Sequence, residues 1–335
     1  MVLGLGLGGQ IAVGIVSMFI LVFGAEEVVE RSTSIAAYCG IPDVLIAMSV
    51  ISIGTSLPEL AAHSIASIKI LNGTLDYAVG SSTVLGANIG SDVVQQTLVV
   101  GIVILGSMLF RGDSEFEFSG TFLKKDYLPM IGTTLMTLIL AWDGILSRID
   151  GLVLFGSFLA YMYFLYHTRQ ERLESSEKPS ENIFRDSFIA LSAMTAVLVS
   201  AHLVLEVVEN VVSATGLGGS LIGVISVGVV SAFPELFTAL GGLRKGAEGI
   251  SLGTLIGSNI TNPLLAIGFG SLLSTYWVPR PLVFWDLPME TITAALLLFY
   301  LLFVSDRKLG WKGGLYLIVL YIFYIVIRFA FFAID

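Results

Sequence analysis

The chain has 335 residues, of which 55% are hydrophobic and 13% charged, and its mean hydropathy is +0.89. This composition indicates a polytopic membrane protein, because apolar runs of about 20 residues, long enough to cross a bilayer, recur along it. The formal net charge is -9, but the acidic residues lie largely in loops and at helix ends, which argues against a nucleic-acid partner. The single cysteine, Cys39, excludes an internal disulfide and a cysteine-based metal cluster.

We predict an all-α membrane protein with ten transmembrane helices, at residues 9–30, 43–70, 77–109, 127–143, 149–168, 186–212, 219–243, 249–274, 286–305 and 311–332. The third segment is long and predicted to be broken. A polar stretch rich in Glu, Ser, Arg and Lys separates the fifth helix from the sixth and is typical of a solvated linker. The predicted organisation is a first five-helix repeat (1–168), a linker (169–185) and a second five-helix repeat (186–335).

The basic residues predict the orientation of the helices. With ten spans, thirteen Lys and Arg residues fall in loops on the side of the linker and four on the side of the termini. Because cytoplasmic loops carry an excess of basic residues, we expect a multi-pass protein of the cell membrane with a cytoplasmic linker and both termini outside.

The two halves of the chain resemble each other. Residues 40–60 align without a gap with residues 216–236, so that Pro58 falls on Pro234 and Glu59 on Glu235. A second block places Asn88 on Asn259. Because each half has an odd number of helices, the second copy enters the membrane the other way up, which is the inverted-topology plan of secondary transporters.

Each copy places a proline and an acid in an apolar segment, Leu57-Pro58-Glu59-Leu60 and Phe233-Pro234-Glu235-Leu236. A charged side chain at bilayer depth costs about 2.5–3.5 kcal/mol on insertion scales, and a mid-helix proline also removes a backbone hydrogen bond. Such a kink is tolerated where the freed carbonyls face protein, water or an ion. Nearby hydroxyls add oxygen, and calcium prefers a mixed set of carboxylate, carbonyl and water oxygens. The hydroxyl residues are Ser52, Thr55, Ser56 and Ser231.

The partner segments, Thr83 to Ser91 and Thr254 to Asn262, combine small residues with amides and hydroxyls. Gly80, Gly86 and Gly90 also fit close helix packing, which is the more common role of such glycines.

With Gly54-Thr55-Ser56-Leu57-Pro58-Glu59 and the Gly-Ala-Asn and Gly-Ser-Asn segments, the chain resembles the cation/calcium exchanger superfamily, and prokaryotic sodium/calcium exchangers in particular. The resemblance implies that Glu59 and Glu235 are the principal calcium ligands, helped by Thr55 and Ser231. It also implies that the first and sixth helices slide over the core, and that flanking counter-ion sites involve Ser52, Ser56, Ala87, Ser91, Ser258 and Asn262.

Several positions depart from the family pattern. Ala232 lacks the hydroxyl that Ser56 keeps, and Ala87 stands where a serine is usual. Ser91 and Asn262 stand where sodium exchangers often have Asn and Asp. Fewer oxygens at the flanking sites leave two alternatives open, which are fewer sodium ions per cycle, or protons carried on Glu59 and Glu235 themselves because low dielectric favours a neutral carboxyl group.

Other ionisable residues have more ordinary interpretations. Asp92 either adds charge to the site or lines the permeation path. Glu26, Glu27 and Glu30 beside Arg31 are interpreted as an interfacial ion-pair cluster rather than an entry vestibule. His63, four residues after Glu59, is a weak candidate for a proton relay. Four acids at predicted helix ends are interpreted as solvated caps: Asp143, Asp150, Asp286 and Glu290.

The sequence therefore predicts a secondary antiporter that exchanges Ca²⁺ for Na⁺, monomeric, in contact with lipid and inorganic cations, and without a cofactor. Proton/calcium exchange is the alternative of the same class, and a passive cation channel is the alternative of a different class. An intramembrane hydrolase using Asp92 and Asp143 is disfavoured because Asp143 lies at a predicted membrane edge. We expect no enzymatic activity, since the chain has no nucleotide loop or nucleophile motif.

Overall fold

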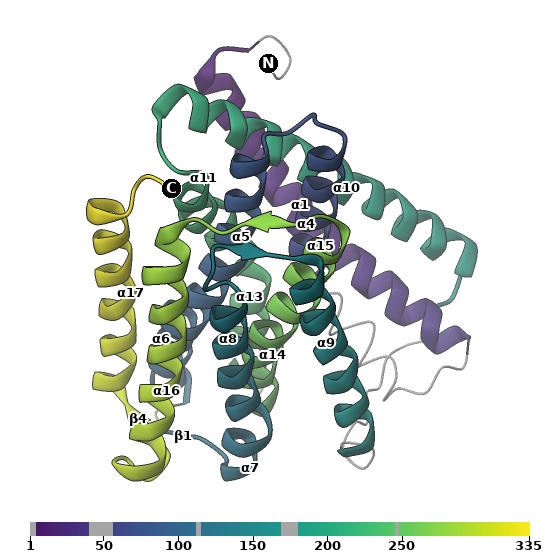
Figure 1. Ribbon diagram of the computed structural model, residues 1–335. Coiled ribbons are helices and arrows are strands. Elements are labelled where there is room, and N and C mark those ends of the chain that lie inside the picture. Colours follow the sequence, from purple (N-terminus) through teal and green to yellow (C-terminus); the bar gives the residue numbers. More distant parts are fainter. Residues whose placement is uncertain (1–4, 40–55, 112–114, 169–179, 245–247) are drawn as a thin grey trace.

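The structure, a computed structural model, describes residues 5–39, 56–111, 115–168, 180–244 and 248–335. The described part is mostly helical (Figure 1). In the first half the helices are α1 (Leu7–Tyr38), α4 (Leu57–Leu71), α5 (Tyr77–Val94), α6 (Val100–Arg111), α7 (Gly120–Phe122), α8 (Leu128–Leu140) and α9 (Arg148–Thr168). In the second half they are α10 (Ile183–Thr215), α11 (Gly219–Ile222), α12 (Gly228–Ser231), α13 (Phe233–Arg244), α14 (Glu248–Thr261), α15 (Gly268–Leu273), α16 (Leu287–Phe303) and α17 (Trp311–Phe331).

Short π-helical turns lie within or at the start of several of these helices, and the helices continue through them. They are η3 (Gln95–Val99), η4 (Leu123–Tyr127), η5 (Gly223–Val227), η6 (Asn262–Ile267) and η7 (Leu282–Asp286). The long third segment is therefore one continuous helix from Tyr77 to Arg111 with a π turn at η3, where the sequence suggested a break. Such turns often lie at functional sites.

Seven helices of the described residues are long and apolar enough to cross a membrane. They span Leu7–Ile35, Tyr77–Leu109, Arg148–Leu165, Ile183–Thr215, Gly219–Phe237, Leu282–Phe303 and Trp311–Phe331. The chain is thus a membrane protein with several apolar helices. The prediction of ten spans stays a prediction, and much of the segment 43–70 lies outside the described residues.

Two short antiparallel ladders add strands to the predicted all-α fold. Strand β1 (Glu115–Glu117) pairs with β4 (Lys308–Gly310), and β2 (Ile145–Leu146) pairs with β3 (Tyr276–Trp277). Each ladder joins a loop of the first half to a loop of the second. They lie before and after α8 along the chain, so they tie the halves together near opposite ends of that helix.

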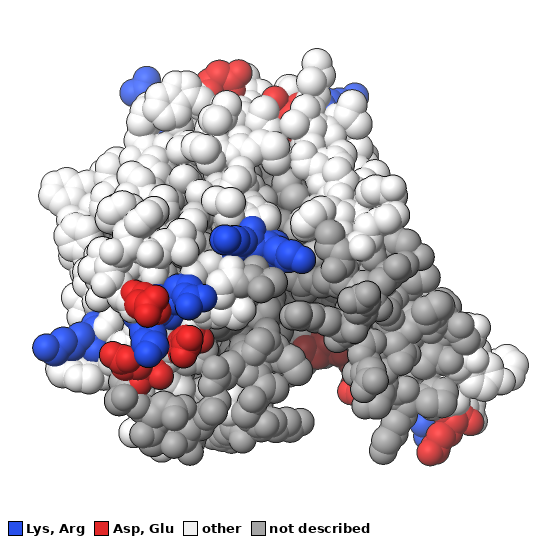
Figure 2. All heavy atoms as spheres, turned by 90° about the horizontal axis from the view of Figure 1, so that it is seen from below, with Lys and Arg blue, Asp and Glu red and all other residues white. Residues whose placement is uncertain are grey.

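Charged side chains gather at the end of the molecule that carries β1 and β4. Figure 2, which views this end, shows Lys, Arg, Asp and Glu side chains clustered there. The exposed ones include Glu115, Glu117, Lys124, Lys125 and Lys312. A charged end beside apolar flanks is the pattern expected where helices leave a bilayer.

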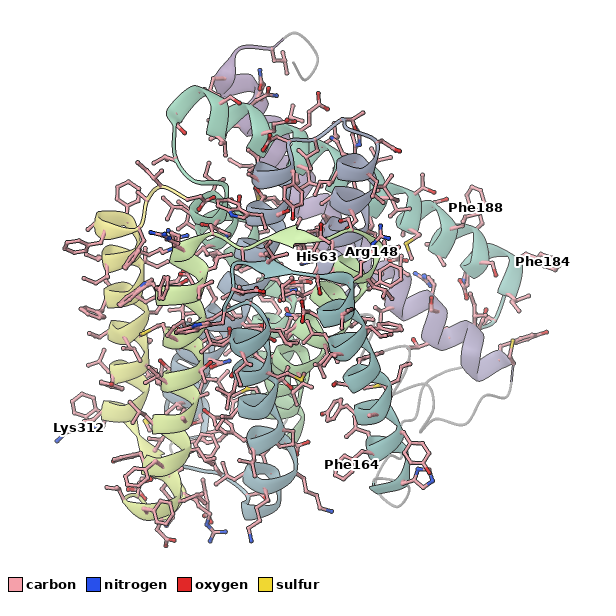
Figure 3. The ribbon with its side chains drawn as sticks, in the orientation of Figure 1. His63, Arg148, Phe164, Phe184, Phe188 and Lys312 are labelled. Carbon is pink, nitrogen blue, oxygen red and sulfur yellow. The ribbon has the colours of Figure 1, made fainter. Side chains whose placement is uncertain are left out.

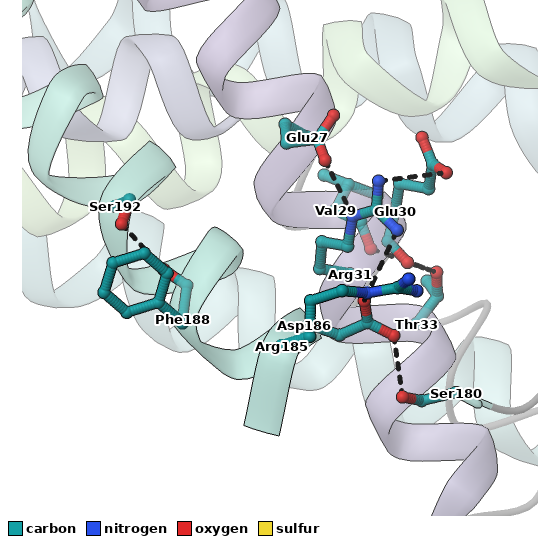
Figure 4. A network of polar contacts seen from close by, with 10 residues as sticks. All are labelled: Glu27, Val29, Glu30, Arg31, Thr33, Ser180, Arg185, Asp186, Phe188 and Ser192. Carbon is teal, nitrogen blue, oxygen red and sulfur yellow. Dashed lines mark hydrogen bonds and ion pairs between the residues drawn. The ribbon is translucent and has the colours of Figure 1, made fainter. Parts of the chain in front are cut away.

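The long helices α1 and α10 lie side by side, tilted against the other helices (Figure 1). A polar network joins them where α1 ends and α10 begins (Figure 4). Arg31 Nε binds Glu27 Oε1 at 2.7 Å, and Arg31 Nη1 lies 3.5 Å from Asp186 Oδ1. The Asp186 carboxylate also accepts a hydrogen bond from Ser180 Oγ at 2.7 Å. The interpretation of this acidic group as an ion-pair cluster is confirmed for Glu27 and Arg31.

Glycines let α5 pack closely on α11, η5 and α12. A Cβ atom added to Gly90 would lie 2.7 Å from Val224 Cα, and one on Gly228 would lie 2.7 Å from the Ala87 carbonyl oxygen. Gly86 faces the backbone of Ser220 in the same way. The packing interpretation of Gly86 and Gly90 is therefore confirmed, and it brings the two segments that carry the candidate site residues into backbone contact.

Candidate functional site

Both glutamates lie in the first turn of a helix that has a proline at its start. Helix α4 starts at Leu57 with Pro58 at its beginning, so Glu59 is in the first turn. In the second copy α12 ends at Ser231, Ala232 is a turn residue, and Glu235 lies in the first turn of α13. The interruption before Pro234 follows from the missing proline N–H and the crowding of the preceding turn by its ring.

Glu59 and Glu235 point into the protein interior and not toward lipid. Their exposed fractions are 5% and 1%, and their charges interact with each other. One carboxylate oxygen of each, Oε2, is buried without a hydrogen-bond partner. Neither residue forms an ion pair with a basic side chain of the described part of the chain. Two buried acids without a basic partner form a site that a cation would neutralise.

Hydroxyl groups from two helices lie near the Glu59 carboxylate. Ser91 on α5 and Ser231 on α12 lie within hydrogen-bonding range of its carboxylate. Ser231 Oγ also donates to the Gly228 carbonyl at 3.2 Å. Ser56, at the start of α4, shares a 2.7 Å hydrogen bond with Thr261 on α14. Two other predicted ligands, Ser52 and Thr55, lie outside the described residues.

A second group of predicted residues lies between α5 and α14. Asn262 Nδ2 donates to Asp92 Oδ1 at 2.9 Å, and Asn88 Nδ2 donates to the Asn262 carbonyl at 3.3 Å. Ser258 Oγ donates to Gln95 Oε1. Asp92 also lies within electrostatic range of Glu290, Glu59 and Glu235. Asp92 is thus a buried acid that faces the helix bundle, and its role at an ion site stays a prediction.

Ala87 takes no part in this polar network. Its side chain packs in an apolar cluster with Val204, Val208 and Val227, while its carbonyl faces Gly228. A hydroxyl group is instead supplied one turn later on the same helix. The hydroxyl of Ser91, four residues after Ala87, lies within hydrogen-bonding range of the Glu59 carboxylate.

Two acids that the sequence placed at solvated helix ends are buried, and that interpretation is wrong. Asp286 accepts hydrogen bonds from Arg328 Nε at 2.9 Å and from Tyr324 at 2.6 Å, and all three side chains are buried. Glu290 accepts a hydrogen bond from Gln96 Nε2 at 3.4 Å. Their partners come from helices distant in the chain, so hydropathy alone does not reveal them.

A third internal match could have placed Glu290 in the interior. Leu123, Leu128, Pro129 and Met130 of η4 and α8 align with Leu282, Leu287, Pro288 and Met289 of η7 and α16. Both segments begin with a π turn that runs into a proline-containing helix start. Glu290 directly follows the second copy of this motif, inside an apolar helix and not in a loop.

His63 lies in the interior near α15 (Figure 3). Its Nδ1 is 3.2 Å from the Tyr276 hydroxyl, which in turn is 2.7 Å from Ser67 Oγ. This network joins α4 to β3 and explains the burial of His63 by packing. The role of His63 as a proton relay stays a prediction.

The described residues contain no group of three or more His, Cys, Asp or Glu side chains close enough to hold a metal ion by themselves. A cation at this site would therefore use hydroxyl, amide and backbone oxygens in addition to two carboxylates, which is a ligand set typical of hard cations.

The apolar helices and the buried carboxylates of Glu59 and Glu235 are features of a membrane protein with acidic groups in its interior. Residues 9–167 and 187–330 match the family model described as sodium/calcium exchanger protein. The chain therefore belongs to that family, whose members are exchangers and not enzymes.

Two relatives illustrate the similarity in sequence. The chain is 26% identical to the inner membrane protein YrbG of Escherichia coli, over 78% of each chain. It is 24% identical to the sodium/calcium exchanger MaX1 of Methanosarcina acetivorans, over 94% of this chain and 97% of that protein.

Two solved structures show the same fold. A crystal structure of the H⁺/Ca²⁺ exchanger CAX matches with a TM-score of 0.77 at 18% identity, covering 95% of this chain and 82% of that one. A structure of the sodium-calcium exchanger NCX_Mj matches with a TM-score of 0.60 at 24% identity, covering 97% and 99%.

Proposed function

We propose that this protein exchanges Ca²⁺ for Na⁺ across a membrane by alternating access, with Glu59 and Glu235 as the two carboxylate ligands of Ca²⁺. The observation that carries the proposal is the pair of buried, mutually interacting glutamates, each with an unpartnered oxygen. Their combined charge matches a divalent cation, and serine hydroxyls from α5 and α12 complete part of its oxygen shell. Thr55 and the backbone before Glu59 are proposed as further ligands.

Counter-ion binding is assigned to the residues that surround this pair. Ser56, Ser91, Asp92, Ser258 and Asn262 all lie in the buried network between α4, α5 and α14. Ser52 and the Ala87 backbone are assigned by the family resemblance alone. Asp92 adds a carboxylate where the first copy lacks the usual serine at Ala87.

The proposed arrangement is an inverted pair of five-helix repeats. The two π-to-proline starts at η4 and η7 fit this plan, as do the two ladders that each join one half to the other. In the proposed orientation the end with β1 and β4 and the linker face the cytoplasm, and the termini face outward. Helices α1 and α10 pack as a tilted pair beside the core, which suits a sliding element.

Proton/calcium exchange is the second candidate. It is favoured by the missing hydroxyls at Ala87 and Ala232 and by the number of buried acids that could carry a proton. Radioactive calcium uptake into proteoliposomes, with sodium and pH gradients imposed separately, distinguishes the two. Uptake driven by sodium alone supports the proposal, uptake driven by pH alone supports the second candidate, and unsaturable flux without a counter-ion indicates a channel.

The site itself is tested by Glu59→Gln and Glu235→Gln. Each change removes one of two carboxylates and is expected to abolish calcium uptake while the protein still inserts and purifies. Glu115→Gln is the matched control, because Glu115 is an exposed acid on β1 that lies 4.0 Å from Lys308. Near-normal uptake by either site variant would refute the assignment.

A further inference from the structure

Asp92 and Glu290 are two buried acids at one junction of helices. Asp92 lies on α5 and Glu290 on α16, with exposed fractions of 1% and 3%. Glu290 is the strongest charged neighbour of Asp92, and Gln96, one turn after Asp92 in the same continuous helix, contacts Glu290 at 3.4 Å. In the described residues neither forms an ion pair with a lysine or arginine. Two such charges are costly to bury unless a cation or a proton neutralises them.

Amide side chains orient both carboxylates and leave their own oxygens free. Gln96 Nε2 donates to Asn259 Oδ1 at 2.9 Å and to Glu290 Oε1 at 3.4 Å, while Gln96 Oε1 is buried without a partner. Asn262 Nδ2 donates to Asp92 Oδ1, and Asn262 Oδ1 is likewise buried without a partner. The oxygen and nitrogen of an amide group are bonded to the same carbon. The unpartnered oxygen of Gln96 is therefore near Glu290, and that of Asn262 is near Asp92.

The junction therefore gathers carboxylate and amide oxygens with few hydrogen-bond donors among them. It is built on η3 and η6, where the helices carry π turns. A set of buried, unsatisfied oxygens has the character of a cation site and not of an anion site or a water-filled pore.

We propose that Asp92, Glu290, Gln96 and Asn262 form a second cation site, separate from the Glu59–Glu235 pair, that takes a sodium ion. Each carboxylate already accepts an amide hydrogen bond, so the site has fewer free oxygens than the six to eight that calcium prefers. A monovalent ion that needs fewer oxygen ligands than calcium fits this site better. The inference rests on the proposed function, because it supplies sodium ligands that offset the missing hydroxyls at Ala87 and Ala232.

The test measures binding of radioactive sodium and radioactive calcium, each alone, to the purified full-length chain in detergent. Glu290→Gln removes a charged ligand of the proposed site, and contacts to charged groups are stronger than neutral ones. The sodium concentration at half saturation is therefore expected to rise by about tenfold or more, while half saturation by calcium changes by less than about twofold, because Glu59 and Glu235 remain. Gln96→Leu is expected to shift sodium in the same direction.

Thr291→Val is the matched control. Thr291 neighbours Glu290 on α16 and is buried, and its hydroxyl donates to the Leu287 carbonyl of the same helix at 2.8 Å. It is expected to leave both binding curves unchanged. Elution as a single species in size-exclusion chromatography and an unchanged melting temperature show that each variant is folded.

Several results would overturn the inference. They are a wild-type protein that binds no sodium, sodium binding that is equal in Glu290→Gln and wild type, and calcium binding that Glu290→Gln abolishes as completely as Glu59→Gln does. The inference would also be overturned if potassium or protons displaced the bound ion and sodium did not. None of these refutes the calcium site, which fails if either Glu59→Gln or Glu235→Gln keeps near-normal calcium uptake.

Discussion

The close approach of α12 to α5 predicts that Gly228→Ala damages the site more than a helix glycine normally does. A Cβ atom on residue 228 would lie 2.7 Å from the Ala87 oxygen, 2.8 Å from Ser91 N and 3.0 Å from Gly90 C. These are backbone atoms of α5 that cannot rotate away. The nearest distance is about 0.7 Å short of the 3.4 Å at which ordinary contact begins, so the two helices must separate by about that amount.

The magnitude follows from two opposed effects. Overpacking of this kind costs about 1–3 kcal/mol, while alanine gains about 1 kcal/mol over glycine in a helix. The net destabilisation is therefore about 0–2 kcal/mol, which is modest. The effect on transport is expected to be larger, because Ser91 on α5 and Ser231 on α12 both reach the Glu59 carboxylate. Sites of this kind tolerate displacements of only about 0.5 Å.

The assays are the melting temperature in detergent and the calcium concentration for half-maximal uptake in proteoliposomes. For Gly228→Ala we expect a small decrease in melting temperature and a rise of roughly tenfold in the calcium concentration. Gly132→Ala on α8 is the control, because no described atom lies within 4 Å of the added Cβ. The reasoning is refuted if the two alanine variants behave alike in both assays.

Three further predictions concern stability, measured by thermal unfolding in detergent. Arg328→Met is expected to destabilise the protein by about 3–5 kcal/mol, because it leaves Asp286 buried without its ion pair, and adding Asp286→Leu is expected to recover most of the loss. A double variant no more stable than the single one would contradict this. Tyr276→Phe is expected to cost about 1–3 kcal/mol, since buried Ser67 and His63 lose the hydroxyl that they contact at 2.7 Å and 3.2 Å, and no loss would show that the hydroxyl is dispensable. Arg31→Ala is expected to cost at most about 1 kcal/mol because the pair is partly exposed, and a larger loss would indicate a buried network.

Sequence reasoning reached the parts of the site that one segment determines. Pro58 and Glu59 share a helix start, as do Pro234 and Glu235, and the proline alone predicts an interruption there. The glycine spacing on α5 likewise predicted close packing, because small residues at regular intervals leave a groove for a neighbouring backbone. These features are local, and the structure keeps them.

The partners of the buried acids were out of reach, because they depend on which helices meet. Asp286 and Glu290 look like helix caps in the sequence, since each stands near the start of an apolar run. Their burial depends on Arg328 and Gln96, which come from other helices. The ladders β1–β4 and β2–β3 are too short for a strand pattern, because a pair of two or three residues shows no alternation.

The distribution of buried charge argues for more than one cation in the transport cycle. Asp286 is neutralised by Arg328, which is fully buried beside it. Glu59, Glu235, Asp92 and Glu290 remain without a basic partner among the described residues. If calcium binds at Glu59 and Glu235 as proposed, it balances only two of these carboxylates, and a further cation or proton is expected to neutralise the other two. Replacing Glu290 should therefore change the counter-ion dependence and keep the calcium dependence, whereas replacing Glu59 should abolish calcium binding whichever counter-ion is supplied.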